Sequence, residues 1–131
     1  MNIFAVDDDP TLSAHQLPDK HIVKMPPECC QMLSIVYSKW YHNYGKVFKA
    51  DGTPYKTEKG AFRNHPCTQW VAESDHNIQW LIQHAISLCE EYTYRYNKTH
   101  SCERSIRLAG VLHQYGCPDK HTPFTRAMPD Q

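Results

Sequence analysis

Three stretches of the chain carry apolar residues at helical spacing. In the first, Cys29, Leu33, Val36 and Trp40 recur at intervals of 4, 3 and 4 residues, which places them on one helical face. The second stretch repeats in the same way through Val71, Ile78, Ile82, Ala85, Cys89, Tyr92 and Tyr96. The third buries Ile106, Ala109 and Leu112 in a helix over about residues 102–115. The pattern predicts an all-α fold, a compact single domain over residues 1–131 with three principal helices.

A pair of prolines interrupts the first helical stretch. Asp19 follows Pro18 and is suited to cap a helix N-terminus. Pro26 and Pro27 each lack an amide donor, and each disfavours helix in the residue before it. We therefore expect a kink here, or a second helix start with proline in its first turn. Glu28 then lies in the first turn of the continuing helix.

The second helical stretch is the longest. It begins after Asn64-His65-Pro66, because proline is favoured in a helix first turn. It ends near Asn97-Lys98, and its length makes a break near Ser74-Asp75 plausible in the sequence. The result is a long helix, or two helices that meet end to end.

A long loop over residues 41–63 joins the first and second helical stretches. Basic side chains dominate it and its edges, with Lys39, Lys46, Lys49, Lys56, Lys59 and Arg63 against only Asp51 and Glu58. The Asp51-Gly52 pair, flanked by apolar residues, favours a hairpin-like turn. Aromatic rings beside lysine suit stacking with nucleic acid. A solvated loop without a ligand explains the same composition equally well.

The overall composition narrows the class of protein. Basic and acidic residues balance at 14 each, so the net charge does not indicate a nucleic-acid binder, although the loop can form a locally positive surface. No apolar run is long enough to cross a membrane, and the N-terminus lacks the pattern of a signal peptide. We expect a cytoplasmic protein without membrane association, whose cysteines stay reduced.

The first helical stretch carries the main candidate chemistry. His21, Lys24 and Glu28 occupy positions i, i+3 and i+7, so an unbroken helix places them on one face. An acid near an imidazole and an ammonium group is suited to proton transfer or to imine chemistry. The same spacing also describes an exposed helix face with a weak ion pair.

Two other chemistries have less support. Cys29 or Cys30 offers a thiol nucleophile at a helix start, but Cys29 belongs to the apolar face. His113, Cys117 and His121 are spaced by four residues, yet a proline between them breaks any helix that would align them. We expect neither a metal ion nor a cofactor.

The first candidate motif points to a known family. Asp19-x-His21-x-x-x-x-x-x-Glu28 resembles the first-helix motif of the pyrimidine-dimer DNA glycosylases of the phage endonuclease V type. In that family the aspartate, the histidine and a catalytic glutamate have this same spacing, on a helix that carries a proline. The resemblance implies an all-helical enzyme that acts on DNA.

A second similarity extends the resemblance to roughly residues 1–100. His65 precedes the second helical stretch, as a histidine does in the family. That stretch ends in an E-x-x-x-R pattern from Glu91 to Arg95, with His100 shortly after, and the family ends its helix in a similar way.

The resemblance also implies a mechanism. In the family an N-terminal α-amine attacks the sugar C1′ of a damaged pyrimidine nucleotide and forms an imine, a glutamate assists, and β-elimination nicks the strand. An α-amine has a pKa near 8, so part of it is neutral and nucleophilic at neutral pH. On this chain the amine is that of Met1 and the acid is Glu28. The groups implied for DNA contact or support are His21, Lys24, His65, Arg95 and Lys98.

The chain departs from the family pattern at three places near the implied site. The acidic run at residues 7–9 would repel phosphate, and Pro27 stands where the family has a basic side chain. The family exposes a small residue after removal of the initiator methionine, whereas this chain has the bulky Asn2 at that position.

Three functions fit the sequence. The first is a DNA glycosylase and abasic-site lyase for damaged or modified pyrimidine nucleotides. The second is a non-catalytic nucleotide- or protein-binding accessory protein on the same scaffold, which blunts a host defence. The third is a small-molecule enzyme that uses His21, Lys24 and Glu28. The chain also resembles small phage-encoded proteins, which implies the cytoplasm of a host cell.

Overall fold

A computed structural model describes residues 8–116, and these residues form helices joined by loops. The helices are α1 (Pro10–His15), α2 (Asp19–Val36), α3 (Pro66–Ala72), α4 (Asp75–Tyr96) and α5 (Glu103–Gly116), with a 3-10 helix η1 (Lys56–Lys59). No strand forms within residues 8–116, so the prediction of an all-α fold is confirmed. The three-helix layout is too simple, because α1 and α3 are separate short helices beside the long α2, α4 and α5.

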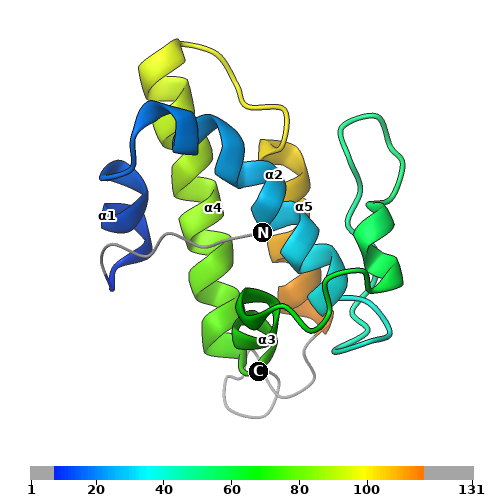
Figure 1. Ribbon diagram of the computed structural model, residues 1–131. Helices are drawn as coiled ribbons and strands as arrows, with labels where there is room; N and C mark the ends of the chain where they lie inside the picture. The colour runs from blue at the N-terminus through cyan, green and yellow to red at the C-terminus, as the bar shows by residue number, and fades with distance from the viewer. Residues whose placement is uncertain (1–7, 117–131) are drawn as a thin grey trace.

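The central element of the fold is α4, which contacts each of α1, α2, α3 and α5. Figure 1 shows α4 upright in the middle, with α1 on one side and α2 and α5 on the other. Its buried residues are Ile78, Leu81, Ile82, His84, Ala85, Ser87, Leu88 and Cys89. Burying this stripe removes apolar surface from water, at about 25 cal/mol for each Å². The position of each other helix therefore depends on how its own apolar side packs against α4.

The prolines of α2 do not divide the helix. The helix runs continuously from Asp19 to Val36, with Pro26 and Pro27 inside it, so the expected second start is wrong. Glu28 accordingly lies in the middle of α2 and not in a first turn. Asp19 is the first helical residue rather than the cap, because Pro18 precedes the helix and makes no side-chain capping bond.

A histidine from another element compensates for one missing helical hydrogen bond. In a regular helix the amide of residue 27 would donate to the carbonyl oxygen of Val23, and Pro27 has no amide hydrogen. His100 lies on the segment that joins α4 to α5, and its Nε2 atom is 3.0 Å from this carbonyl oxygen. This contact is partly buried, and a polar group left without a partner in such a place costs up to about 1–3 kcal/mol. His100 thus helps α2 to continue through its proline pair.

The second helical stretch divides where the sequence suggests. Ser74 separates α3 from α4, and its side-chain oxygen accepts a hydrogen bond from the Asn77 amide at 3.1 Å. The end of α4 is set by Asn97, which adopts the left-handed conformation that often ends helices. Two residues of the predicted apolar faces are misassigned, because Trp40 lies beyond α2 and Tyr96 is 39% exposed.

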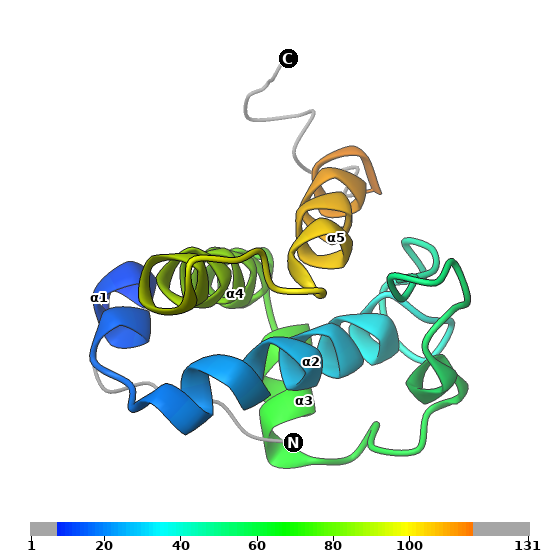
Figure 2. The same cartoon turned by 90° about the horizontal axis from the view of Figure 1, so that it is seen from above.

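The basic loop is ordered by contacts with the helices. An isolated antiparallel bridge joins Phe48 and Pro54, which confirms the hairpin-like turn. The Ser105 hydroxyl of α5 donates to the Phe48 carbonyl of the loop. Beside the loop, the Tyr37 hydroxyl just after α2 donates to the Ala109 carbonyl of α5 at 2.7 Å. Figure 2 places the loop at the C-terminal end of α2, on the side of the molecule opposite α1.

Among residues 8–116 no helix is both long and apolar enough to span a membrane.

The hydrogen bond from His100 to Val23 gives a prediction about stability. His100→Ala leaves the Val23 carbonyl oxygen without its donor, so we expect the free energy of unfolding to fall by about 1–3 kcal/mol. In a Pro27→Ala background the new amide can donate to the same carbonyl. The loss should then be smaller by about 1 kcal/mol, measured by urea denaturation of the four proteins as a double-mutant cycle.

His84→Ala is the matched control for this cycle. His84 is also buried, and its Nδ1 atom lies 3.0 Å from the carbonyl oxygen of Pro10, which Pro27 does not affect. Its cost should be the same with and without Pro27→Ala. If His100→Ala also costs the same free energy of unfolding with and without Pro27→Ala, His100 does not compensate for the proline.

Candidate active site on α2

The predicted triplet lies on the outward side of the first half of α2. At 100° for each residue, His21, Lys24 and Glu28 fall within about 60° of one another around the helix axis. Lys24 is exposed, and His21 and Glu28 are partly exposed. Lys24 precedes Glu28 by one turn, about 6 Å along the axis, and His21 precedes it by about 10 Å. The continuous helix therefore gives the face that the sequence predicts.

Packing fixes the orientation of this face. Ile22, Met25, Cys29, Leu33 and Val36 are buried and point to the core. Around the helix axis the centre of this buried set lies about 110° from the centre of the triplet, so the triplet borders the buried stripe and is not part of it. The second half of α2 is buried on nearly all sides, so a polar face remains only in the first half. The triplet belongs to the accessible part of α2, together with the exposed Lys20 and Val23.

The carboxylate of Glu28 is thus presented by a rigid helix rather than by a loop. The chemistry also needs the amine of Met1, which lies outside the described residues.

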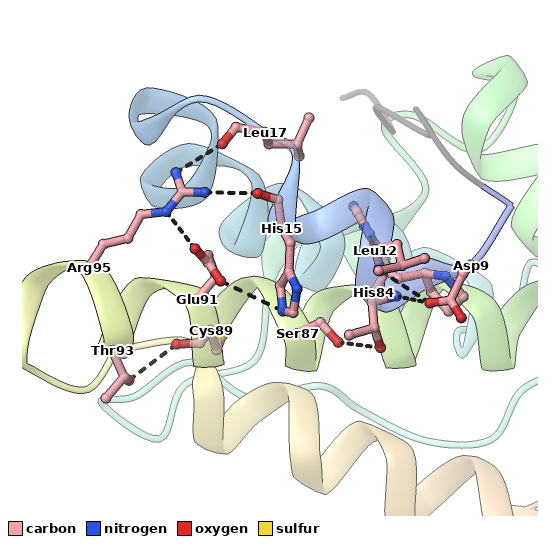
Figure 3. Close-up of polar contacts among 12 residues, drawn as sticks. Asp9, Leu12, His15, Leu17, His84, Ser87, Cys89, Glu91, Thr93 and Arg95 are labelled. Carbon is pink, nitrogen blue, oxygen red and sulfur yellow. Dashed lines mark hydrogen bonds and ion pairs between the residues drawn. The ribbon is translucent and has the colours of Figure 1, made fainter.

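Arg95 connects the end of α4 to the start of α2. Its Nη1 atom donates to the Leu17 carbonyl and to the Asp19 carboxylate, both at 2.9 Å. Its Nη2 atom donates to the His15 carbonyl at 3.1 Å, and its Nε atom to Glu91 at 2.7 Å. Figure 3 shows the guanidinium group facing the connection between α1 and α2. The resemblance implies DNA contact for Arg95, whereas the geometry gives it a positioning role.

The Arg95 contacts also give a structural reason for the charges around it. Glu91, one turn earlier on α4, contacts both Arg95 and His15, the latter at 3.6 Å. These hydrogen bonds to Arg95 hold its pKa above the ordinary value, with Glu91 as the main cause and Asp19 as a second. Because Asp19 is the first residue of α2, the clamp sets where the site helix begins.

The other residues implied for DNA contact do not gather at one point. Figure 1 shows α3 beside the N-terminal end of α4, whereas the connection to α5 leaves the opposite end. Lys98 is exposed just after α4, near Arg95, and His65 immediately precedes α3. Since α4 has 22 residues, its ends are about 30 Å apart. His65 and Lys98 can share a ligand only if that ligand is extended, as a DNA strand is.

His65 caps α3. Its Nδ1 atom accepts a hydrogen bond from the Cys67 amide at 3.1 Å, so the neutral ring carries its proton on Nε2. The ring is partly exposed. His65 therefore presents a donor at the start of α3, a helix that packs against α2.

Three core cysteines, among them both candidates on α2, do not support a thiol nucleophile. Cys29, Cys30 and Cys89 are fully or almost fully buried. Burial raises the pKa of Cys29, and it raises the pKa of Cys89 to about 12. A thiol that resists ionisation is a poor nucleophile. These side chains serve as small apolar core residues.

The metal site considered for His113, Cys117 and His121 is not seen in the part of the chain that the structure describes. His113 is buried. Its Nδ1 atom lies 3.0 Å from the side-chain amide nitrogen of Gln79, and its Nε2 atom lies 3.3 Å from the Asp75 carboxylate. Cys117 and His121 lie outside residues 8–116, and no group of three metal-ligating side chains occurs within that range. His113 instead joins α5 to the start of α4.

Sequence reasoning missed two side chains that shape the site. From the sequence, Asp19 was expected only to cap a helix, and its contact with Arg95 was not predicted. His100 was noted only as a histidine after the helix end, without a role. The signal for the first was the E-x-x-x-R pattern, because Arg95 has donors for more than the glutamate one turn earlier. The signal for the second was the carbonyl that a mid-helix proline leaves without a donor.

The clamp predicts that lysine cannot replace Arg95. Arg95→Lys keeps the charge but loses the fork of donors that reaches His15, Leu17 and Asp19 together. We expect the free energy of unfolding to fall by about 1–3 kcal/mol, measured by urea denaturation. Arg107→Lys is the matched control, because Arg107 also pairs with a glutamate one turn earlier but is 47% exposed. It should cost under about 1 kcal/mol, and equal losses would contradict the clamp.

The chain was compared with known protein families, curated proteins and solved structures. The family described as pyrimidine dimer DNA glycosylase matches residues 1–104, a range that covers Met1, the α2 face, His65 and the Arg95 clamp. Searches of curated proteins and of solved structures each found no match. The family implies DNA binding and DNA repair by base excision. Since the match covers most of the chain, the resemblance seen in the sequence is confirmed, and the chain belongs to the pyrimidine dimer DNA glycosylase family.

Proposed function

We propose that the protein is a DNA glycosylase and abasic-site lyase for damaged or modified pyrimidine nucleotides. The family match over residues 1–104 carries this proposal, because it includes the N-terminus and the whole of α2. The polar face of α2 supports it, since His21, Lys24 and Glu28 lie outward on one continuous helix. The α-amine of Met1 is the nucleophile and Glu28 transfers protons.

The reaction has two stages. The neutral amine of Met1 attacks the sugar C1′, the C1′–N bond breaks, and the base leaves with the bonding pair and takes up a proton. The attacking nitrogen then loses a proton, the sugar ring opens, and its oxygen takes up a proton to leave an imine. Removal of a C2′ proton breaks the C3′–O bond and releases the strand end.

Glu28 suits these proton transfers. A carboxylate can take the proton from the attacking amine and return it to the sugar oxygen. Its place in the middle of a packed helix holds it in one position, which keeps the acid near the reacting atoms. The exposed ammonium group of Lys24, one turn away, suits a phosphate beside the reacting sugar.

The remaining residues suit binding along the strand. His21 and His65 are proposed to contact the substrate, and Lys98 a more distant phosphate. Arg95 is proposed to act through Asp19, by fixing the start of the site helix. The target nucleotide must leave the base stack for C1′ to be attacked.

The mechanism predicts a covalent intermediate that depends on the N-terminus. With abasic-site DNA and borohydride, the full chain should form a reduced adduct whose mass maps to residue 1. Glu28→Gln should slow strand nicking by about 10²- to 10⁴-fold. Glu73→Gln is the charge-matched control, since Glu73 is an exposed carboxylate at the end of α3.

Two results would contradict this mechanism. Nicking by Glu28→Gln at the wild-type rate would remove the acid assignment. Absence of an adduct from a chain with a free N-terminus would remove the imine. DNA binding without either activity would favour the non-catalytic alternative, and binding that does not weaken with salt would contradict phosphate contacts.

A further inference from the structure

A pocket lies at the other end of α2, away from Glu28. Its volume is about 610 Å³, within the size range of small-ligand sites. The lining residues come from the end of α2, the turn after it and η1, and are Tyr37, Ser38, Lys39, Trp40, Asn43, Gly45, Lys46, Glu58 and Lys59. Neither Glu28 nor any other residue of the α2 triplet takes part.

The pocket is positively charged although the chain as a whole is neutral. Three of its lining side chains are lysines and one is an acid. Glu58 is paired with Lys46 at 2.9 Å. Lys39 and Lys59 are exposed, and within residues 8–116 neither has a carboxylate partner. The charge left over is suited to an anion such as phosphate.

An exposed indole ring is fixed at the edge of this pocket. Trp40 is 44% exposed, which is high for so large an apolar side chain. Its Nε1 atom donates to the Lys59 carbonyl at 3.0 Å, and the Arg63 guanidinium lies 4.1 Å from the ring centroid. Gly60 lies so close that a Cβ atom there would be 2.5 Å from the indole nitrogen. The ring therefore has one position and offers a surface for stacking.

The polypeptide around the pocket is already ordered. The Tyr41 hydroxyl donates to the Arg63 carbonyl, which closes the loop across its base. Ser34 of α2 and Thr57 of η1 form a hydrogen bond through their hydroxyl groups. A site that is ordered before binding loses less conformational entropy when the ligand arrives.

We propose that this pocket binds one unpaired nucleotide of a DNA strand, with the base against Trp40 and a phosphate between Lys39 and Lys59. Lysine alone would suit any anion, but the fixed indole ring selects one that carries an aromatic group. The proposal deepens the proposed function and rests on it for the identity of DNA as the substrate.

The position of the pocket sets a spacing along the strand. Val36, the last residue of α2, is eight residues beyond Glu28, which is about 12 Å along the axis. At about 3.4 Å for each nucleotide, this corresponds to roughly four nucleotides. A strand that reacts near Glu28 therefore reaches the pocket with a neighbouring nucleotide and not with the damaged one.

The test measures binding of the full chain to a labelled single-stranded oligothymidylate by fluorescence anisotropy. Trp40→Leu should weaken binding about 5- to 150-fold. Lys39→Gln with Lys59→Gln should weaken it about 10-fold and reduce the slope against log salt by about 1.4. Wild-type affinity in both variants would overturn the proposal.

Matched controls separate the pocket from the general charge of the loop. Lys49→Gln with Lys56→Gln changes two exposed lysines of the same loop that do not line the pocket. Trp70→Leu changes an exposed tryptophan on α3. Both should bind nearly as the wild type does, and losses equal to those of the pocket variants would overturn a specific site.

Two further measurements distinguish the source of the nucleotide and the state of the proposed function. Free dTMP should bind far more weakly than the strand, and equal affinity would overturn a strand site. Lengthening the tail beside an abasic site from about two to about six nucleotides should increase affinity for the wild type but not for Trp40→Leu. Strand binding that depends on Trp40 without any borohydride adduct would support the pocket while the glycosylase mechanism fails. A borohydride adduct together with normal DNA binding by the pocket variants would support the glycosylase mechanism and overturn the pocket.

Discussion

Burial of the apolar stripe of α4 is the constraint on which the described structure depends. The other α-helices pack against α4, and α2 buries Cys29, Leu33 and Val36 in the same core. A helix with one side fixed has no freedom about its axis, because packed interiors tolerate little rotation. His21, Lys24 and Glu28 then point outward as a consequence of core packing. The direction of the candidate site is thus set by residues that carry no chemistry.

The site helix keeps two prolines at a structural cost that other elements reduce. An interior proline costs a helix about 3 kcal/mol. His100 supplies the donor that Pro27 cannot, through its contact with the Val23 carbonyl. Arg95 fixes the start of the same helix through Asp19. Both supports come from the end of α4 and the segment after it, so the second half of the family motif acts on the first half through hydrogen bonds.

The two candidate DNA contacts divide the work between the ends of α2. From its first turns to its middle, the polar face offers a lysine and an acid, which suits a reaction. Beyond its end, Trp40 and two lysines offer stacking and charge, which suits holding a strand. This division explains how a chain with 14 basic and 14 acidic residues can bind DNA, because the positive charge is local. An extended ligand can contact both ends at once.

Helical periodicity determined the all-α class, the approximate ends of α4 and α5 and the polar face of α2, because these depend on residues close in sequence. The Asp19, His21 and Glu28 spacing also determined the family. Only the tertiary structure decided that α2 continues through Pro26 and Pro27, since the compensating donor is His100, far along the chain. It also decided that Arg95 joins two helices and that Trp40 lines a basic pocket instead of the core. Those outcomes depend on contacts between distant segments, which spacing within one segment cannot encode.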